Sequence, residues 1–391
     1  MHRAASRLSC TVLAGLWSVL PAGCGRRSGT PEPPAAAADV VPPAPSSEGS
    51  PGVRVREPFD PVGYTHTAAG IERVIAFATE REAALAAEGE VADAAGDEPF
   101  VAAVSPHDDY AYAAQVYIHV FPRIRARHVL LIGVAHHARD FPQSEGRLVF
   151  ESFDAWHGPH GDVPISPLRA DLLGALPADD VLVSDELHAG EHSLEALVPF
   201  LQNAVRDVAI VPVLVPYMPW ERLVELAGKT ADALADALRA RGWAPGEDAA
   251  IVISSDAVHY GDRDWGGKNH AEFGTDGAAY DRAVARDLGL LRDDLEGPLS
   301  EARLEALYRA LVQDDFHEYR ITWCGRFSIP FGLIVLERTA AQLGRPNPQG
   351  VLLRYATTLD PGRGDPAVEG LGVTAPANLH HWVGFAALGW R

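Results

Sequence analysis

The chain has 391 residues, of which 53 are acidic and 33 basic, giving a net charge of −20, and 47% of its residues are hydrophobic. This apolar content is enough for a sizeable core. Because a protein that binds a nucleic-acid backbone needs a concentrated basic surface, the acidic balance excludes nucleic acid as an expected partner.

The first 24 residues have the pattern of an export signal. Arg3 and Arg7 precede an uncharged stretch, Leu8 to Gly23, which is shorter than the roughly 20 apolar residues of a membrane span. The stretch leads into Cys24 through Leu20-Pro-Ala-Gly, which resembles a bacterial lipoprotein processing site with Cys24 as the lipidated residue. A conventionally cleaved secretory signal is the alternative. We therefore expect an exported protein of the bacterial cell envelope, facing the periplasm or exterior, whose membrane contact is only a lipid anchor.

Residues 25–55 are rich in Pro, Ala, Ser and Gly and contain few large apolar side chains. Such a segment cannot bury enough surface to offset the entropy lost on ordering, so we expect a disordered linker. Residues 56–391 then form the expected folded domain.

In that domain, strand-like and helix-like segments alternate along the chain. Pro212 and Pro216 favour an edge position for the strand they accompany. The alternation predicts a single layered α/β domain with a mostly parallel central sheet, where ligands bind beyond the carboxyl ends of the strands. Apolar runs predict strands at Phe100–Ser105, Val129–Val134, Val208–Val215, Ala249–Ser254, Val351–Thr357 and Trp382–Trp390. Helical spacing predicts helices at Ala69–Glu88, Ser166–Leu176, Leu194–Val205, Trp220–Arg241, Gly277–Leu291, Ser300–Val312 and Pro330–Leu343.

Three of the predicted strands run directly into histidine-bearing segments, and Cys324 follows as the single cysteine of the domain. Since parallel strands end at a common edge, we expect these side chains to converge. Imidazole and thiolate are ligands of borderline and soft transition metals, which predicts one mononuclear metal site. The alternative is a satisfied buried polar cluster with an apolar cysteine. The three segments are Pro106-His107-Asp-Asp-Tyr110, Ala135-His136-His137 and Ser254-Ser-Asp256-Ala-Val-His259.

Together with two further motifs, these segments resemble the Memo family, which includes the bacterial proteins called AmmeMemoRadiSam system protein B. The resemblance extends from about Arg56 to the C-terminus. It implies the α/β fold of LigB-type class III extradiol dioxygenases and a metal vestibule lined by three histidines and a cysteine. The further motifs are Glu191-His192-Ser193-Leu194-Glu195 and Cys324-Gly-Arg326.

Carried over by motif, the resemblance implies that His107, His136 and Cys324 bind the metal. It places His259 beside them as a fourth ligand or proton carrier, with Asp256 close behind to accept a ring N–H. Iron or copper is the expected metal, and zinc fits the same ligands. Extradiol dioxygenases use two histidines and a carboxylate, so ring cleavage does not follow from the fold.

Four neighbouring residues have roles that the sequence leaves open. His137 is expected to pack or hydrogen-bond beside the ligands. Glu191 and His192 either line the pocket or cap a helix. Arg326 either stabilises the thiolate of Cys324 or binds a substrate anion.

Asp108 and Asp109 depart from the His-Ala-Gly-Tyr pattern usual in Memo relatives. The two acids either add negative charge to the vestibule, where they would affect cation affinity and substrate shape, or are solvated loop residues. The sequence does not decide between these roles.

The leading hypothesis is a Memo-like envelope metalloprotein with iron- or copper-dependent redox or O₂-linked chemistry on a small molecule. One alternative is a non-catalytic scaffold that binds a peptide or other ligand. Another is a cysteine hydrolase with Cys324 as nucleophile, His259 as base and Asp256 as orienting acid. The substrate, the metal and the oligomeric state stay open at this stage.

Overall fold

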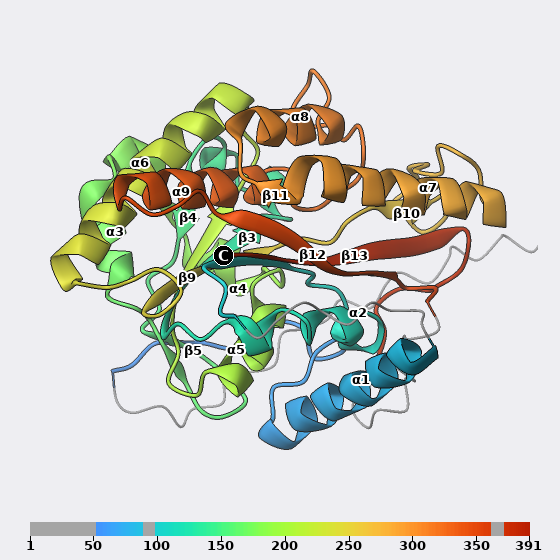
Figure 1. Ribbon diagram of the computed structural model, residues 1–391, viewed down its shortest axis with the longest axis horizontal. Helices are drawn as coiled ribbons and strands as arrows, with labels where there is room; N and C mark the ends of the chain where they lie inside the picture. The colour runs from blue at the N-terminus through green and yellow to red at the C-terminus, as the bar shows by residue number, and fades with distance from the viewer. Residues whose placement is uncertain (1–51, 89–97, 361–370) are drawn as a thin grey trace, which may run out of the picture. The chain divides into compact units, whose positions relative to one another are not determined.

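A ten-stranded mixed sheet crosses the centre of the fold (Figure 1). The computed structural model describes residues 52–88, 98–360 and 371–391, which belong to one compact unit. The strands follow the order β11-β12-β13-β2-β9-β3-β8-β4-β7, and β10 pairs with β13. The strands of this sheet are β2 (Ala102–Ser105), β3 (His128–Val134), β4 (Leu148–Phe150), β7 (Val181–Val183), β8 (Ala209–Val215), β9 (Ala249–Ser254), β10 (His259–Gly261), β11 (Gly297–Pro298), β12 (Gln349–Thr357) and β13 (His381–Trp390). A separate three-stranded sheet contains β1 (Val55–Arg56), β5 (Ala155–Trp156) and β6 (Val163–Pro164).

The predicted α/β fold class is confirmed, but the sheet is mixed rather than mostly parallel. Its centre is parallel: β2 pairs with β9, β9 with β3, and β3 with β8. On one side β13 runs antiparallel to both β2 and β12, and on the other β4 runs antiparallel to β8. A parallel pair also joins β4 to β7, but the continuous parallel run is β2-β9-β3-β8, which includes the three strands that carry the histidine segments.

The predicted edge position of β8 is wrong. This strand lies between β3 and β4 in the sheet. On the β4 side, bridges join Ile165 to Ile210 and Val149 to Leu214. Pro212 falls between these two points, so its missing N–H interrupts no hydrogen bond there.

Helices cover both faces of the sheet (Figure 1). On one face α3, α6, α8 and α9 pack over a core that includes Ile132, Ile253 and Leu333. The other face is covered by α1, α2 and α5, over a core that includes Val129 and Val252. The helices are α1 (Ala68–Glu88), α2 (Tyr110–Tyr117), α3 (Leu168–Ala175), α4 (Asp185–Ala189), α5 (Val198–Ala204), α6 (Trp220–Arg241), α7 (Gly277–Leu290), α8 (Glu301–Leu311) and α9 (Ser328–Gln342).

Helix boundaries follow the local chemistry. Helix α6 has the predicted bounds and ends at Gly242, whose φ of +68° lies in the left-handed region that glycine adopts without strain. The helix predicted from Leu194 begins instead as a short 3₁₀ turn, and α5 starts only at Val198. Pro199 explains the delay, because proline lacks the N–H that a preceding helical turn would require.

Cys24, the predicted signal segment 1–24 and most of the predicted linker 25–55 lie outside the described residues. Among the residues that the structure does describe, no helix is both long and apolar enough to cross a bilayer.

Candidate metal centre

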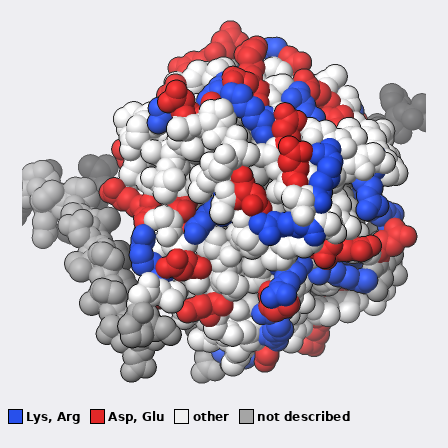
Figure 2. Space-filling view, turned by 90° about the vertical axis from the view of Figure 1, so that its left-hand side faces the viewer, with Lys and Arg blue, Asp and Glu red and all other residues white. Residues whose placement is uncertain are grey.

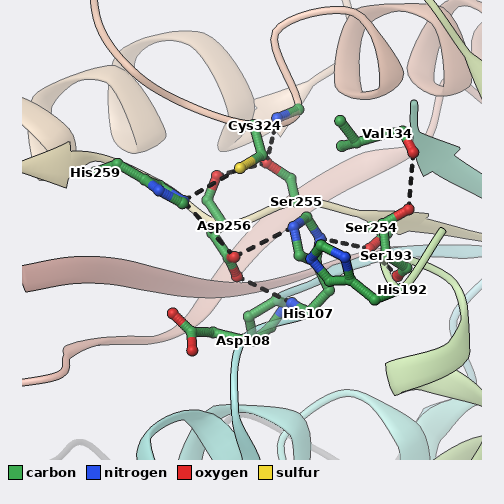
Figure 3. Close-up of polar contacts among 12 residues, drawn as sticks. His107, Asp108, Val134, His192, Ser193, Ser254, Ser255, Asp256, His259 and Cys324 are labelled. Carbon is green, nitrogen blue, oxygen red and sulfur yellow. Dashed lines mark hydrogen bonds and ion pairs between the residues drawn. The ribbon is translucent and has the colours of Figure 1, made fainter. Parts of the chain in front are cut away.

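The candidate site is assembled at one edge of the sheet (Figure 3). His107 and His136 each follow the last residue of their strand, β2 or β3, by two positions, and Ser254 is the last residue of β9. Because β9 lies between β2 and β3 and all three are parallel, the segments beyond them converge. The predicted convergence of the histidine segments is thus present.

The loop before α9 brings Cys324 to the same edge. A bridge between Val258 and Trp323 holds this loop against the segment that follows β9. The backbone N–H of Gly325 donates to Oγ of Ser255 at 3.0 Å. A Cβ atom at position 325 would lie only 2.2 Å from that oxygen, so glycine is what allows the loop to approach so closely.

The three predicted ligands lie together. One ring nitrogen each from His107 and His136 and the Sγ atom of Cys324 are all within 4.8 Å of one another. Nε2 of His259 is 3.1 Å from the same sulfur. A small inward shift would bring the three atoms to the roughly 2.0–2.3 Å at which imidazole and thiolate bind a transition metal.

Hydrogen bonding fixes the tautomer of His107. The hydroxyl of Ser254 donates to the carbonyl of Ser193 at 2.5 Å and must therefore accept from Nδ1–H of His107, at 2.8 Å. The other nitrogen, Nε2, is then a bare lone pair. It is buried, has no hydrogen-bond partner, and lies 3.3 Å from Oδ2 of Asp256.

Two acceptors facing each other in a buried site repel unless a positive charge lies between or beside them. Burial lowers the pKa of His107 to about 3, although Asp256 opposes this, so the imidazole does not itself supply that charge. The unpartnered nitrogen of His107 therefore fits a bound metal cation. This observation supports His107 as one of the metal ligands.

His136 is oriented by Glu191. Its Nδ1 lies 2.8 Å from one carboxylate oxygen, and its backbone N–H donates to the other at 2.7 Å. This contact leaves Nε2 of the ring free for the cluster. Although burial opposes it, Glu191 raises the pKa of His136 well above its usual value. The ring of His192 stacks on that of His136, with centroids 4.6 Å apart.

Glu191 therefore lies behind His136 at the site and does not cap a helix, and it lines neither of the cavities described below. It lies after the end of α4, is almost fully buried, and also accepts the backbone N–H of Ser193. A carboxylate that holds the second nitrogen of a metal-binding histidine is a common way to fix ring orientation and basicity.

Asp256 connects the remaining groups. Its Oδ1 accepts the backbone N–H of His107 at 2.9 Å, and its Oδ2 lies 3.8 Å from Nε2 of His259. Although burial opposes it, the nearby His107 and His259 lower the pKa of Asp256 to about 2. Burial raises the pKa of the Cys324 thiol, despite the opposing effect of His136. A metal charge at the cluster would favour the thiolate.

Two cavities adjoin the cluster. The larger, of about 340 Å³, is lined by His107, His136, His192, Asp256 and His259 together with residues of surrounding loops. The smaller, of about 50 Å³, lies on the side of Cys324 and Arg326. The larger cavity gives a small molecule access to the cluster.

The two acids after His107 have separate roles. Asp109 is 2% exposed and accepts from the backbone and hydroxyl of Thr374, so it is not a solvated loop acid. Burial raises its pKa to about 6. Asp108 lines the larger cavity, where burial and the neighbouring Asp256 raise its pKa well above the usual range.

Two further candidate residues lie away from the larger cavity. The side chain of His137 is 49% exposed and faces Asp140 at 3.7 Å, so it does not join the cluster. Arg326 is buried with its guanidinium 3.6 Å from the ring centre of Tyr319 and donates to the carbonyl of His317. Arg326 thus borders the smaller cavity behind Cys324.

Part of the cavity wall was not predicted from the sequence. Trp265 and His381 stack with ring centroids 3.8 Å apart and both line the larger cavity. They are brought together by the antiparallel pairing of β10 with β13, which joins residues 259–261 to residues 381–383. No motif marks either residue, and a pairing between segments about 120 residues apart has no local sequence signal.

The fold and the site define a class: a single α/β domain with a buried cluster of two imidazoles, a thiol and a carboxylate that could hold a metal ion. The family model described as Memo-like protein matches residues 80–364 of this chain. The chain therefore belongs to the Memo-like protein family.

Curated relatives support this assignment. The chain is 28% identical to a MEMO1 family protein of Methanococcoides burtonii over 277 residues, covering 70% of this chain and 85% of that protein. It is 30% identical over 168 residues to one from Methanosarcina mazei, covering 42% and 56% of the two chains. It is 34% identical over 158 residues to one from Aquifex aeolicus, covering 40% and 52%. The latter two matches thus span about half of those relatives.

Proposed function

We propose that the chain is a metalloprotein that holds one iron or copper ion through His107, His136 and Cys324 and acts in redox or O₂-linked chemistry on a small molecule. The observation that carries the proposal is the buried Nε2 of His107, which has no partner and faces the carboxylate of Asp256. When bound, such a metal supplies one-electron chemistry that no amino-acid side chain of the cluster offers.

The side chains around the donors have definable tasks. Ser254 accepts the Nδ1–H of His107 and Glu191 that of His136, so in each imidazole Nε2 is the nitrogen left to bind the metal. His259 borders the larger cavity and contacts Cys324, which places it to take or give a proton at a molecule bound there. Asp256 lies beside the same ring, with its Oδ2 3.8 Å from Nε2.

Metal analysis of the purified chain tests the proposal. We expect about one iron or copper per purified chain, and a much lower metal content in Cys324→Ser and His107→Ala, whose weaker sites would fill only when metal is added in excess. His137→Ala is the matched control, because this exposed histidine is next to His136 but outside the cluster. Equal metal content in all variants would contradict the proposal. Stoichiometric zinc would retain the ligand set and contradict the redox chemistry.

One observation favours a second candidate, a cysteine hydrolase. Sγ of Cys324 lies 3.1 Å from Nε2 of His259, which is within the reach a nucleophile and its base require. On this alternative a thiol-reactive probe labels Cys324 rapidly in metal-free protein, and His259→Gln slows the labelling strongly. The metal proposal predicts instead that loading with iron or copper protects Cys324 from the probe.

The alternative of a non-catalytic binding scaffold has less support if its ligand is an anion. The described residues lining the larger cavity include four aspartates and no lysine or arginine. An anion would therefore enter a cavity of its own charge sign. A metal-free protein that bound phenylacetate tightly would restore this alternative.

We also propose that the chain is exported and anchored in the cell envelope through lipid on Cys24. The support is the sequence of residues 1–24, with its basic start, short apolar stretch and terminal cysteine. Cys24→Ala should shift the protein from the membrane fraction to the soluble fraction or leave it unprocessed. An unchanged distribution would contradict the lipid anchor.

A further inference from the structure

The larger cavity beside the metal centre has a one-sided charge, whereas acidic and basic side chains are interspersed on the face of the molecule shown in Figure 2. Of its described lining residues, Asp60, Asp108, Asp109 and Asp256 are acidic, and none is lysine or arginine. Carboxylates gathered around a partly enclosed space attract cations and exclude anions. The charge alone does not define a ligand, because most of these acids already have structural partners.

Asp108 differs from the other three acids. Among the described residues its carboxylate accepts only the adjacent backbone N–H of Asp109, at 2.6 Å, and it forms no ion pair with any of them. Figure 3 shows its carboxylate apart from the network that joins His107, Asp256 and Cys324. The other three have partners: Asp60 accepts from Val62 and Gly63, Asp109 from Thr374, and Asp256 from His107.

His381 supplies a second, independent indication of a ligand. This residue is 4% exposed and lines the cavity. Its Nδ1 lies 3.1 Å from the carbonyl oxygen of Arg263, which only accepts, so Nδ1 carries the hydrogen. Nε2 is then an acceptor, and it has no partner. The wall therefore holds one acceptor without a donor, Nε2 of His381, and one carboxylate, Asp108, whose donor is only its neighbour's backbone N–H. The indole N–H of Trp265 also lacks a partner among the described residues.

Apart from the histidines and Thr374, the rest of the wall is apolar or aromatic. Trp265 presents an indole stacked on His381, and indole faces favour cationic groups. At the rim, Phe59 lines the cavity and is nonetheless 51% exposed. Val62 and Val373 are also exposed and lie on the two segments joined by the hydrogen bond from Gly372 to Val62. This arrangement suits an apolar body.

We propose that the larger cavity binds an organic cation, a protonated amine on an aromatic or apolar body, with its ammonium group at Asp108. An ammonium group offers hydrogen-bond donors to Asp108 and His381, and its positive charge favours the ionised form of the Asp108 carboxyl. This inference rests on the proposed function, since it takes the cavity as the substrate chamber of the metal centre.

Calorimetric titration with three ligands that share one ring tests the proposal: benzylamine, protonated at neutral pH, benzyl alcohol and phenylacetate. We expect benzylamine to bind the purified chain more tightly than either of the others. Binding to metal-free protein as well would show that the amine is not simply coordinating the metal. Asp108→Asn should weaken benzylamine binding by about tenfold or more, while Asp314→Asn, which changes a fully exposed acid, should not.

Metal content of the same samples separates the two proposals. If Asp108→Asn keeps its metal but no longer binds benzylamine, the variant is folded and the inference is supported. Benzylamine binding by a chain that takes up no metal would end the proposed function and leave this inference standing. Three results would each overturn this inference. They are a benzylamine affinity in Asp108→Asn equal to that of wild type, tighter binding of phenylacetate than of benzylamine, and no benzylamine binding at millimolar concentration.

Discussion

Nδ1 of His107 lies 2.8 Å from the hydroxyl of Ser254, and this hydroxyl is committed to donating elsewhere, to the carbonyl of Ser193. The serine therefore dictates which nitrogen of the imidazole carries the hydrogen. We predict that Ser254→Ala lowers metal affinity by about 10–100-fold, the usual effect of removing a residue that orients a ligand. Competition against a chelating dye measures the change.

Ser144→Ala is the control for that variant. Ser144 is equally buried, but its hydroxyl has no partner in the described structure and it lies outside the cluster. Its loss should leave metal affinity unchanged. Wild-type affinity in Ser254→Ala would show that the hydroxyl does not set the tautomer of His107.

Glu191 orients His136 as Ser254 orients His107. Because Glu191 receives both the ring and the backbone N–H of His136, Glu191→Gln should reduce metal affinity by about 10–100-fold as well. The expected signature is a smaller rise in melting temperature on adding metal, since stabilisation by a ligand depends on its dissociation constant. Glu186→Gln, on the exposed side of α4, should show the full rise.

Metal affinity should increase with pH. At neutral pH the metal-free cluster holds a proton on His136, because Glu191 raises its pKa although burial opposes it, and a second proton on Cys324, whose pKa burial raises. Metal binding displaces both protons, so the apparent affinity should rise by about 100-fold per pH unit below these pKa values. In Cys324→Ser the dependence should fall to about tenfold per unit. A pH-independent affinity would contradict this assignment of protons.

Much of this site could be predicted from the sequence because its ligands follow local patterns. His107 and His136 come directly after apolar runs, and the ends of neighbouring parallel strands meet for geometric reasons. The position of Cys324 could not be predicted in this way, because Cys324 lies in a loop and not at the end of a strand. The tautomer of His107 could not be predicted either, as it depends on the close approach of Ser254 and Ser193.

The outer wall of the cavity depends on longer-range contacts. His381 reaches it through the pairing of β10 with β13, and Thr374 through a hydrogen bond to Asp109. The edge position expected for β8 is wrong because Pro212 does not mark a free edge: it lies between two bridges to neighbouring segments. Such errors arise where tertiary pairing overrides a local signal.

A buried acid away from the cluster should make stability depend on pH. Burial raises the pKa of Asp287 to about 6, although Trp323, Val258 and Tyr355 donate hydrogen bonds to it. The folded state thus keeps a proton that the unfolded chain releases near pH 4, so this contribution is full below about pH 4 and is lost as pH rises through about 6.

The size of this effect is at most about 3 kcal/mol. Urea unfolding of metal-free protein between pH 4 and 7 should show wild-type stability falling over that interval, and Asp287→Asn should remove this part of the decline. Asp293→Asn, which alters an exposed acid, should retain it. A decline in Asp287→Asn as steep as in wild type would assign the effect to other groups.

X-ray absorption at the metal edge tests the central claim most directly, since it reports which atoms surround the ion in the intact protein. With iron or copper bound, we expect one sulfur at about 2.3 Å together with imidazole nitrogens at about 2.0 Å. The sulfur contribution should vanish in Cys324→Ser, and the nitrogen contribution should decrease in His107→Ala. A metal surrounded only by oxygen and nitrogen in the wild-type chain, or a sulfur signal that persists in Cys324→Ser, would contradict the account.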